Sequence, residues 1–428
     1  MRTVRVTHPT KKVAATIQLP SSKSISNRVL ILQAISGNNI ALENISTADD
    51  TLIMQSALFQ KTGIIDVKNA GTCMRFLTAY FASINCEVEL QCDERMKLRP
   101  IKILVNALRD LGADISYLQE EGFPPLKIKG KQLDGGNIKM NASVSSQFIS
   151  ALMLVAPIFK NGLEIELTEE ISSRSYIEMT ANLINRFGFD CSFIKNKITI
   201  QHQPINQSTK QPITFSIEQD WSSAAFWYEI VALSEDAEIL LKDLSLKSLQ
   251  GDCIISEYMK VFGVETIETD EGIVLKKFNH GDTEQQRHKS THQPINQSTN
   301  LSNTLDLAPT LTVTAAAKNI ETELSGLKNL KIKESNRLQS LETELKKCNF
   351  NIVAKDDSLI IHSTSNTKLQ TSNSKLQTYN DHRLAMSFAP LALLFDDVMI
   401  ENPDVVEKSY PHFWEDLKLA GFELEFNI

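Results

Sequence analysis

Residues 143–200 read SVSSQFISALMLVAPIFKNGLEIELTEEISSRSYIEMTANLINRFGFDCSFIKNKITI and contain one copy of the pattern on which the fold depends. The stretch opens with serines followed by a nearly all-apolar run, which is typical of a capped, buried helix. The β-like segment GLEIEL (162–167) comes next, and an amphipathic run then ends at Gly188 ahead of a second β-like segment, NKITI (196–200). Glycine takes the left-handed conformation just past a helix at little cost, so Gly188 predicts a helix end. The stretch therefore predicts an α/β module with two kinds of helix.

This module recurs six times along the chain. Its amphipathic runs end at Gly63, Gly112, Gly188, Gly263, Asn349 and Gly421. Its nearly all-apolar runs occupy residues 22–35, 69–82, 143–156, 220–233, 305–317 and 380–393, each with Ser, Asn or Asp near its start. Regular self-similarity of this kind indicates a repeat architecture. We predict six α/β units of about seventy residues, most simply arranged as three plus three.

Composition excludes several classes of protein. The chain has 428 residues and a net charge of −8, from 44 Lys and Arg against 52 Asp and Glu. Such a length predicts two or three domains, and the acidic balance argues against nucleic-acid binding. The N-terminus has no apolar signal segment, and the longest apolar stretch, 384–395, is shorter than the ~20 residues that span a bilayer. Six scattered cysteines without a C-x-x-C pair predict reduced thiols in a cytoplasmic protein with no membrane contact.

Motifs for common cofactors are missing. The chain has no H-E-x-x-H, no Walker loop and no G-x-G-x-x-G, and its eight histidines do not cluster. We therefore expect neither a metal nor an organic cofactor.

Three polar segments interrupt the repeats. Residues 201–212, 279–304 and 364–378 are rich in Asn, Gln, Ser and Thr, and HQPINQST occurs at both 202–209 and 292–299. These segments have too little apolar surface to offset the entropy of ordering, so we expect exposed, flexible loops.

Charged and polar residues collect at the predicted helix starts and in the polar loops. Lys23, Ser24 and Arg28 open the first buried helix, and Gly71 the second. Ser145, Ser146, Gln147, Asp306 and Arg383 open others, while Arg99, Ser173, Lys333, Glu334, Arg337 and Lys408 precede or begin amphipathic runs. Helix N-termini favour anions, and arginine binds phosphate and carboxylate bidentately. Any one of these residues could be mere capping, but their joint occurrence predicts a pocket for highly anionic metabolites.

The motifs that carry these residues resemble the 5-enolpyruvylshikimate-3-phosphate synthases, a family of enolpyruvyl transferases. The motifs are LPSSKSISNR (19–28), NAGTCMR (69–75), RMKLRP (95–100), SVSSQF (143–148), LDLAPT (305–310), KIKESNRL (331–338) and YNDHRLAM (379–386). The resemblance extends from about residue 14 to the end, outside the three polar segments. It implies an α/β fold of two domains, each of three units, with the buried helices pointing at the interdomain cleft. We expect the first domain at 19–221 and the second at 1–18 plus 222–428.

The resemblance also implies the reaction and its residues. The family transfers the enolpyruvyl group of phosphoenolpyruvate to the 5-hydroxyl of shikimate 3-phosphate, on the shikimate route to aromatic amino acids. The matching positions for shikimate 3-phosphate are Lys23, Ser24, Arg28, Ser145, Ser146, Gln147, Ser173, Asp306, Asn329 and Lys333. Those for phosphoenolpyruvate are Lys23, Gly71, Arg99, Gln147, Arg337, Arg383 and Lys408. We expect a cytoplasmic monomer that acts on these two small molecules.

The chemistry assigns roles to the catalytic candidates. The attacking hydroxyl loses a proton and the methylene carbon gains one, which suits Asp306 as base, Lys333 as its helper and Glu334 as proton donor, with Lys23 close by. Asp306 could instead be a plain helix cap, and Arg28 and Arg75 could form internal ion pairs.

Two alternatives remain. The sister family, which acts on UDP-N-acetylglucosamine, starts with a K-N-A motif and uses a loop cysteine, both of which are absent here. A non-catalytic anion binder would not need Asp306 and Glu334. The chain also departs from its family at Ser21, where glycine is common, and at Phe76, where proline is common.

Overall fold

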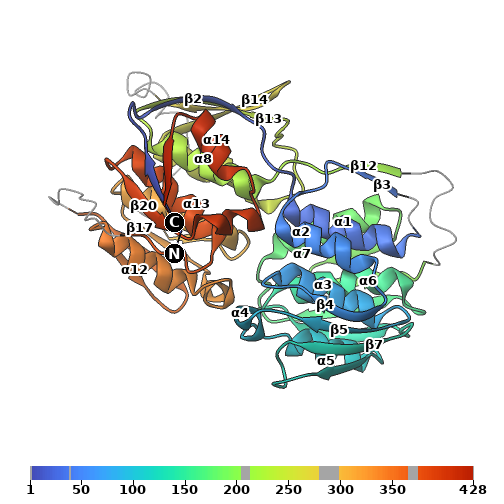
Figure 1. Ribbon diagram of the computed structural model, residues 1–428. Coiled ribbons are helices and arrows are strands. Elements are labelled where there is room, and N and C mark those ends of the chain that lie inside the picture. The colour runs from blue at the N-terminus through green and yellow to red at the C-terminus, as the bar shows by residue number, and fades with distance from the viewer. Residues whose placement is uncertain (1, 38–39, 204–212, 279–297, 365–374, 428) are drawn as a thin grey trace. The chain divides into compact units, whose positions relative to one another are not determined.

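The computed structural model describes residues 2–37, 40–203, 213–278, 298–364 and 375–427. Contacts within the chain divide it into two compact units. Unit 1 comprises residues 1–20 and 219–428, and unit 2 comprises residues 21–218. In unit 1 the two ends of the chain share a sheet, because β1 (Thr3–Thr7) pairs with β20 (Val398–Glu401) and β21 (Glu423–Asn427) (Figure 1).

Four four-stranded sheets repeat one topology within the described residues. In unit 2 the first has the order β4 (Thr62–Asp66), β5 (Cys86–Gln91), β7 (Leu126–Gly130), β6 (Asp114–Tyr117), and the second has β8 (Gly136–Asn141), β9 (Leu163–Thr168), β11 (Lys197–Ile200), β10 (Cys191–Ile194). In unit 1 the third sheet has the order β2 (Lys12–Ile17), β13 (Asp236–Lys242), β15 (Gly272–Lys277), β14 (Val264–Thr269). The fourth sheet has the order β16 (Thr299–Asn300), β17 (Thr322–Ser325), β19 (Ser358–His362), β18 (Asn351–Ala354). Each sheet has one parallel pair followed by two antiparallel pairs.

The two remaining sheets are shorter. Strands β3 (Ile40–Glu43) and β12 (Ile213–Ser216) pair in parallel in unit 2, and the three-stranded sheet of β20, β1 and β21 completes unit 1. Each unit thus has three sheets among its described residues. The sixfold α/β pattern read from the sequence is confirmed.

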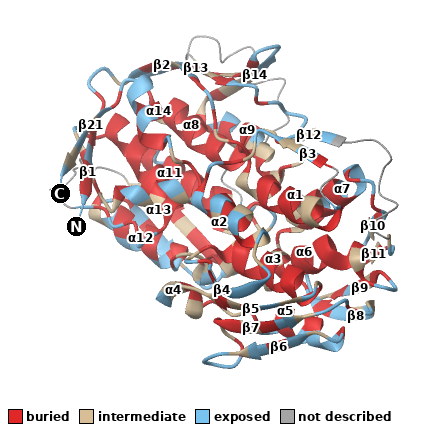
Figure 2. Ribbon diagram, turned by 45° about the vertical axis from the view of Figure 1, so that its right-hand side comes forward, coloured by how far each residue is buried: buried red, intermediate tan, exposed pale blue. Residues whose placement is uncertain are grey.

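The all-apolar runs form the helices at the centre of each unit. They are α1 (Lys23–Ile35), α3 (Gly71–Ala82) and α6 (Ser146–Val155) in unit 2, and α8 (Trp221–Leu233), α11 (Ala308–Ala317) and α13 (His382–Phe388) in unit 1. The three helices of each unit contact one another, and Figure 2 shows all six as mostly buried. A helix that is apolar all round has no face for water, so it must be enclosed.

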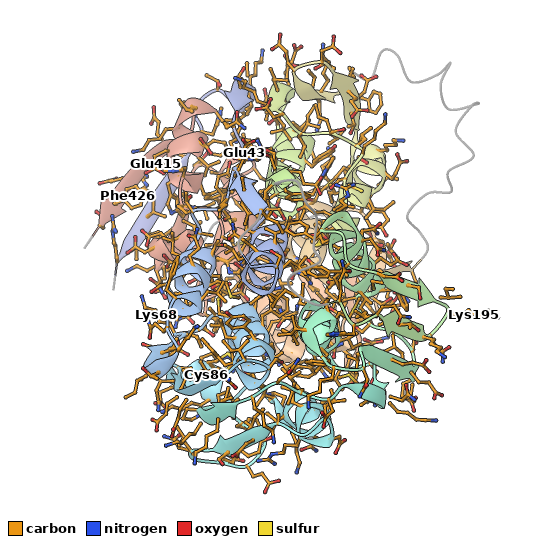
Figure 3. The ribbon with its side chains drawn as sticks, turned by 90° about the vertical axis from the view of Figure 1, so that its right-hand side faces the viewer. Glu43, Lys68, Cys86, Lys195, Glu415 and Phe426 are labelled. Carbon is orange, nitrogen blue, oxygen red and sulfur yellow. The ribbon has the colours of Figure 1, made fainter. Side chains whose placement is uncertain are left out.

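Amphipathic helices and sheets cover these central helices. The covering helices are α2 (Asp49–Leu58), α5 (Lys102–Asp110), α7 (Arg174–Arg186), α9 (Ile255–Tyr258) with the 3₁₀ turns around it, α12 (Arg337–Lys347) and α14 (Phe413–Leu419). The sheets present their turns outward, as Figure 3 shows at Lys195 in the turn between β10 and β11. No helix in the described part of the chain is long and apolar enough to cross a membrane.

The predicted left-handed residues are confirmed, with one correction. Gly63, Gly112, Gly188, Gly263, Asn349 and Gly421 all have positive φ. Gly112 and Asn349 each follow the last helical turn directly, as expected of a helix end. Gly63 does not, because α2 ends at Leu58 and Gly63 is already the second residue of β4.

Four of the six central helices are capped by a side chain, as the sequence predicts. Ser22, Ser145, Asp220 and Asp381 accept a backbone N–H at the starts of α1, α6, α8 and α13. The cap positions of α3 and α11 are Ala70 and Leu307, which make no such bond. Asp306 lies in the 3₁₀ turn before α11 and is the cap residue of neither this turn nor α11. The interpretation of Asp306 as a helix cap is therefore wrong.

The polar segments are described only at their ends. Residues 204–212, 279–297 and 365–374 lie outside the described residues, so their expected flexibility stays a prediction. The described ends of these segments contradict part of the expectation of exposed loops. Residues Thr299–Asn300 form β16, and Leu376 is buried and bridges to Ile400 of β20.

Glu229 is an acidic residue in the apolar centre of unit 1. It lies in α8, is fully buried, and neither carboxyl oxygen has a hydrogen-bond partner among the described residues. Burial raises the pKa of Glu229 well above its ordinary value and so favours the protonated form of its carboxyl. In the unfolded chain it ionises near pH 4.3. Glu229 therefore destabilises the fold increasingly as pH rises above that value.

We expect Glu229→Leu to stabilise the protein by about 1–3 kcal/mol at pH 7, because an apolar side chain removes the unsatisfied carboxyl. The gain should shrink as pH falls towards 4. Calorimetric unfolding of wild type and variant at several pH values measures it. Glu235→Leu, at an exposed carboxylate just after α8, is the matched control and should change stability by less than about 0.5 kcal/mol. Equal or lower stability of the Glu229 variant at every pH would contradict this account.

Candidate active site

The residues selected from the sequence fall into two groups, one in each unit. In unit 2 they cluster at helix starts. Lys23 is the first residue of α1, Gly71 of α3 and Ser146 of α6, while Ser145 and Ser173 are the cap residues of α6 and α7. Backbone N–H groups without intrahelical partners and the positive end of the helix dipole are thus presented beside these side chains.

Arg28 is a buried cation held by neutral groups. Its guanidinium donates to Thr180 Oγ1 at 2.8 Å, to the Ser24 carbonyl at 2.8 Å and to Ser150 Oγ at 3.4 Å. It also lies over the rings of Phe76 and Tyr176. No carboxylate among the described residues pairs with it, so the alternative of an internal ion pair is wrong for Arg28.

The missing counter-charge has an electrostatic consequence. Burial lowers the pKa of Arg28 to about 10, and the opposing effect comes from the Tyr176 phenol rather than from a carboxylate. A buried charge without a protein partner is costly unless a ligand supplies the opposite charge. An anionic ligand would supply the counter-charge that Arg28 lacks among the described residues.

Two further arginines surround Gly71. A Cβ at this position would lie 2.7 Å from Nη1 of Arg75 and 2.8 Å from both Nη atoms of Arg99. Only glycine lets these guanidiniums approach the start of α3 so closely. Arg75 donates to the carbonyls of Gly71 (3.0 Å) and Pro100 (3.4 Å), which fits a supporting role.

Gln147 joins two of the helix starts. Its side-chain amide nitrogen, Nε2, donates to Thr72 Oγ1 at 3.4 Å, and this hydrogen bond links the start of α6 to the start of α3. Lys23 forms an ion pair with Asp50 of α2 at 3.0 Å, and Asp50 is buried. Asp50 was not among the site residues selected from the sequence, although its position beside Asp49 at the start of an amphipathic run was an available signal.

In unit 1, Asp306 lies among three cations. Its carboxylate is 3.0 Å from Arg337 Nη1, 3.0 Å from Arg383 Nη2 and 3.8 Å from Lys333 Nζ. Burial would raise the pKa of Asp306, but Arg383, Lys333 and Arg337 outweigh it and hold the pKa well below its usual range. The carboxylate is therefore ionised at every physiological pH.

Arg337 is the centre of this cluster. It is almost fully buried at the start of α12, and its guanidinium binds Asp381 (Nε–Oδ2 2.7 Å), Asp306 (3.0 Å) and Glu334 (3.0 Å). Glu334 in turn lies 3.3 Å from Lys408 Nζ. The cluster thus contains the cations Lys333, Arg337, Arg383 and Lys408 against the carboxylates Asp306, Glu334 and Asp381, a net charge of 4 − 3 = +1.

Asp381 is a functional candidate that the sequence reading missed. It was not among the residues selected from the sequence, yet it caps α13 and forms an ion pair with Arg337, a residue 44 positions away. Its place in YNDHRLAM, two residues before Arg383, was the available signal. Asn329, the remaining candidate, lies in a 3₁₀ turn, Lys328–Ile332, directly before Lys333.

No metal site is visible in the part of the chain that the structure describes, where no three His, Cys, Asp or Glu side chains gather suitably. The helix starts of unit 2 can bind anions. The cluster of unit 1 combines two arginines, which can bind anions, with the carboxylates Asp306 and Glu334 and two lysines, which are suited to moving protons.

Comparison with known proteins shows the family of the chain. The sequence model of the EPSP synthase (3-phosphoshikimate 1-carboxyvinyltransferase) family matches residues 55–417. The chain is 43% identical to the 3-phosphoshikimate 1-carboxyvinyltransferase of Bacteroides fragilis strain YCH46 over 97% of both chains. The chain belongs to the EPSP synthase family. It is also 32% identical to the protein of the same name from Vibrio atlanticus, over 96% of this chain and 98% of that one.

Solved structures of the family share the fold. The chain matches an EPSP synthase from Acinetobacter baumannii with a TM-score of 0.76 at 22% identity, over all of both chains. A second structure from the same organism gives a TM-score of 0.73 at 21% identity and covers 99% of each chain. The α/β enolpyruvyl transferase fold expected from the sequence is confirmed.

Proposed function

We propose that this protein carries out the reaction of its family. It transfers the enolpyruvyl group of phosphoenolpyruvate to the 5-hydroxyl of shikimate 3-phosphate, giving 5-enolpyruvylshikimate 3-phosphate and phosphate. The observation that carries the proposal is the position of Asp306, an ionised carboxylate among Arg337, Arg383 and Lys333. This arrangement places a base inside a set of cations suited to a carboxylate and a phosphate.

The residues of unit 1 account for the proton transfers. Asp306 accepts the proton of the 5-hydroxyl as its oxygen bonds to C2 of phosphoenolpyruvate, and Lys333 holds that hydroxyl. Glu334, which is ionised beside Arg337 and Lys408 without ligand, would take up a proton when the substrates bind and donate it to the methylene carbon, which gives a tetrahedral intermediate. When the bond from C2 to the phosphate oxygen breaks, phosphate leaves with the proton held by Asp306, and the methyl group returns a proton to Glu334 to restore the double bond. Positioned acids and bases of this kind accelerate reactions about 10²–10⁴-fold.

Anion binding would make Asp306 a better base. In the structure its carboxylate lies beside two arginines and a lysine, and these cations keep the pKa of Asp306 low. Arg337 and Arg383 would turn part of their hydrogen bonding towards the carboxylate and phosphate of phosphoenolpyruvate, with Lys408 assisting. As these cations are drawn to the ligand, the proton affinity of Asp306 rises. Substrate binding thereby prepares the base.

The residues of unit 2 act mainly as anion holders. Arg28, Ser24, Ser145, Ser146, Gln147 and Ser173 would bind shikimate 3-phosphate, while Gly71 and Arg99 would bind phosphoenolpyruvate and Lys23 both. In unit 1, Asn329 would add a contact to shikimate 3-phosphate. Support comes from the uncompensated charge of Arg28 and from the two guanidiniums beside Gly71.

We expect Arg28→Lys to raise the dissociation constant of shikimate 3-phosphate about 10- to 100-fold, because lysine keeps the charge but loses the planar fork that Thr180 and Ser150 orient. Calorimetric titration measures the constant. Arg186→Lys, at an exposed position at the end of α7, is the matched control and should bind like wild type. An unchanged constant in the Arg28 variant would remove Arg28 from the binding site.

The function is tested by phosphate release from phosphoenolpyruvate, with shikimate 3-phosphate or UDP-N-acetylglucosamine as acceptor and EDTA in place of added metal. Release with shikimate 3-phosphate alone supports the proposal. Release with the sugar nucleotide alone would assign the chain to the sister enzyme, and no release with either acceptor would favour a non-catalytic anion binder.

We further propose that the protein works as a cytoplasmic monomer without a cofactor. All six cysteines are free thiols, which suits a reducing compartment. Light scattering at the concentration of the assay tests the monomer against the chain mass of 48.0 kDa.

A further inference from the structure

Glu344 is a fully buried carboxylate near the end of α12, and none of the roles above uses it. Its Oε1 accepts a hydrogen bond from the Tyr379 hydroxyl at 2.7 Å, and its Oε2 accepts the backbone N–H of Gln377 at 2.8 Å. Lys347 Nζ lies 2.6 Å from the same Oε2 and also donates to the Lys375 carbonyl at 3.2 Å. Glu344 thus ties the end of α12 to the segment that leads into α13.

The start of α12 binds the same segment a second time. Arg337 binds Asp381 through Nε–Oδ2 at 2.7 Å and Nη2–Oδ1 at 3.2 Å. Arg337 and Glu344 are 344 − 337 = 7 positions apart in the helix. Because seven residues make about two turns, both side chains project from the same side of α12. The stretch 377–381 is therefore held at both ends by one helix.

The backbone between these two anchors has an unusual conformation. Tyr379 has a φ of 52° and Asn380 a φ of 57°, so both lie in the left-handed region. Asparagine is often found there, whereas a bulky side chain such as tyrosine is disfavoured. Such a conformation persists only where the surrounding structure fixes it. Tyr379 is 39% exposed, so packing around its ring is incomplete and its hydrogen bond to Glu344 is the specific contact that holds it.

This left-handed turn determines where two site residues lie. Asp381 follows Asn380 directly, and its carboxylate both binds Arg337 and caps α13 by accepting the Arg383 backbone N–H at 3.1 Å. Arg383 in turn places Nη2 3.0 Å from Oδ2 of Asp306. Any relaxation of the turn would displace Asp381 from Arg337 and shift the start of α13 with it. The two guanidiniums would then lose their fixed positions.

We propose that Glu344 is a positioning residue for phosphoenolpyruvate binding. Its two hydrogen bonds to the segment before α13 hold the left-handed turn and thereby fix Asp381 against Arg337. Arg383, at the start of α13, depends on the same turn. The inference rests on the proposed function in assigning phosphoenolpyruvate to these two arginines. Glu344 contacts no reacting atom in this account.

The first test is Tyr379→Phe, which removes one hydrogen bond and leaves the buried charge of Glu344 with Lys347 and the Gln377 N–H. KM for phosphoenolpyruvate should rise about 3- to 10-fold, because the turn loses its specific contact. The value of kcat and KM for shikimate 3-phosphate should stay within about twofold of wild type. Steady-state kinetics measures all three.

The matched control is Tyr117→Phe in β6 of unit 2. Its hydroxyl has no hydrogen-bond partner among the described residues, so the variant should behave like wild type. An unchanged KM for phosphoenolpyruvate in the Tyr379 variant, or an equal change in the Tyr117 variant, would overturn the proposal.

Rescue by glutamine separates positioning from general stability. In Glu344→Gln the amide oxygen can accept the Gln377 N–H while the amide nitrogen donates to the Tyr379 hydroxyl oxygen, so both links to the segment remain. This variant should keep KM for phosphoenolpyruvate within about threefold of wild type. Glu344→Ala lacks both links and should raise this KM about 10- to 100-fold, with a smaller effect on kcat.

Two results would contradict the positioning role of Glu344. A glutamine variant as impaired as the alanine variant would show that the charge matters rather than the links. Equal losses in kcat and in KM for both substrates would show a general structural role. If Glu344→Ala yields no folded protein, the Tyr379 and glutamine variants still decide the question.

A second measurement does not require turnover. Calorimetric titration with phosphoenolpyruvate should give a dissociation constant about 3- to 10-fold higher for Tyr379→Phe than for wild type. If this rise appears in protein that releases no phosphate, the positioning role stands and the proposed reaction falls. Equal binding by variant and wild type would overturn the inference and leave the proposed reaction intact. Absence of binding by wild type would overturn both.

Discussion

Asp306→Asn should lower kcat by about 10²–10⁴-fold, because the amide keeps the size of the side chain but cannot accept the hydroxyl proton. KM for phosphoenolpyruvate should stay the same or fall. Arg337 and Arg383 lose an anionic partner in the variant and gain free charge for the ligand. Steady-state kinetics with both substrates measures the two parameters separately.

The control for this variant is Asp396→Asn, which removes an exposed carboxylate from the same unit and should leave both parameters within twofold of wild type. A kcat within threefold of wild type in the Asp306 variant would exclude Asp306 as the base. A large rise in KM with kcat unchanged would assign it to binding instead.

Arg337→Met should destabilise the protein by about 3–5 kcal/mol, because it leaves three largely buried carboxylates without their shared cation. Burial would lower the pKa of Arg337, but Asp381, Glu334 and Asp306 raise it, which shows how strongly this charge is held. Activity should also fall at least 100-fold, since Arg337 is proposed to bind the substrate anions. Urea unfolding and steady-state kinetics measure the two effects.

The matched control is Arg2→Met, which breaks an Arg–Asp pair of 2.6 Å to Asp404 at the surface. Both of those side chains are close to half exposed, so the loss should be at most about 1 kcal/mol. If the two variants lose equal stability, the buried cluster is not held together by Arg337. Arg337→Lys should fall between wild type and Arg337→Met, because it retains the charge without the fork.

The helical framework followed from local rules. An apolar run longer than two helical turns has no side for water, so the enclosure of α3 or α6 could be read from its composition. The ends at Gly112 and Asn349 followed from the left-handed conformation that these residue types tolerate. Gly63 shows the limit of such rules, since the same glycine conformation also occurs inside a strand.

The site residues were identified from motifs, whereas their partners were not. Ser150 and Thr180 hold Arg28 from positions 122 and 152 residues away, and both hydroxyls lie within helices where no local signal marks them. Asp381 is part of the YNDHRLAM motif, but its ion pair with Arg337 depends on how α12 and α13 are placed in the fold. Ion pairs of this kind are set by three-dimensional neighbours, which spacing along the chain does not encode.

The chain order of apolar and amphipathic runs is therefore sufficient for the sixfold α/β architecture and for the types of residue at the helix starts, because both depend on periodicity and backbone preference over a few residues. Protonation states required the folded chain. Asp306 and Asp252 are both aspartates in 3₁₀ turns that contact α8, yet three cations lower the pKa of the first while burial raises that of the second. Their opposite shifts arise from charge and solvent exclusion contributed by distant segments, and only packing brings those segments together.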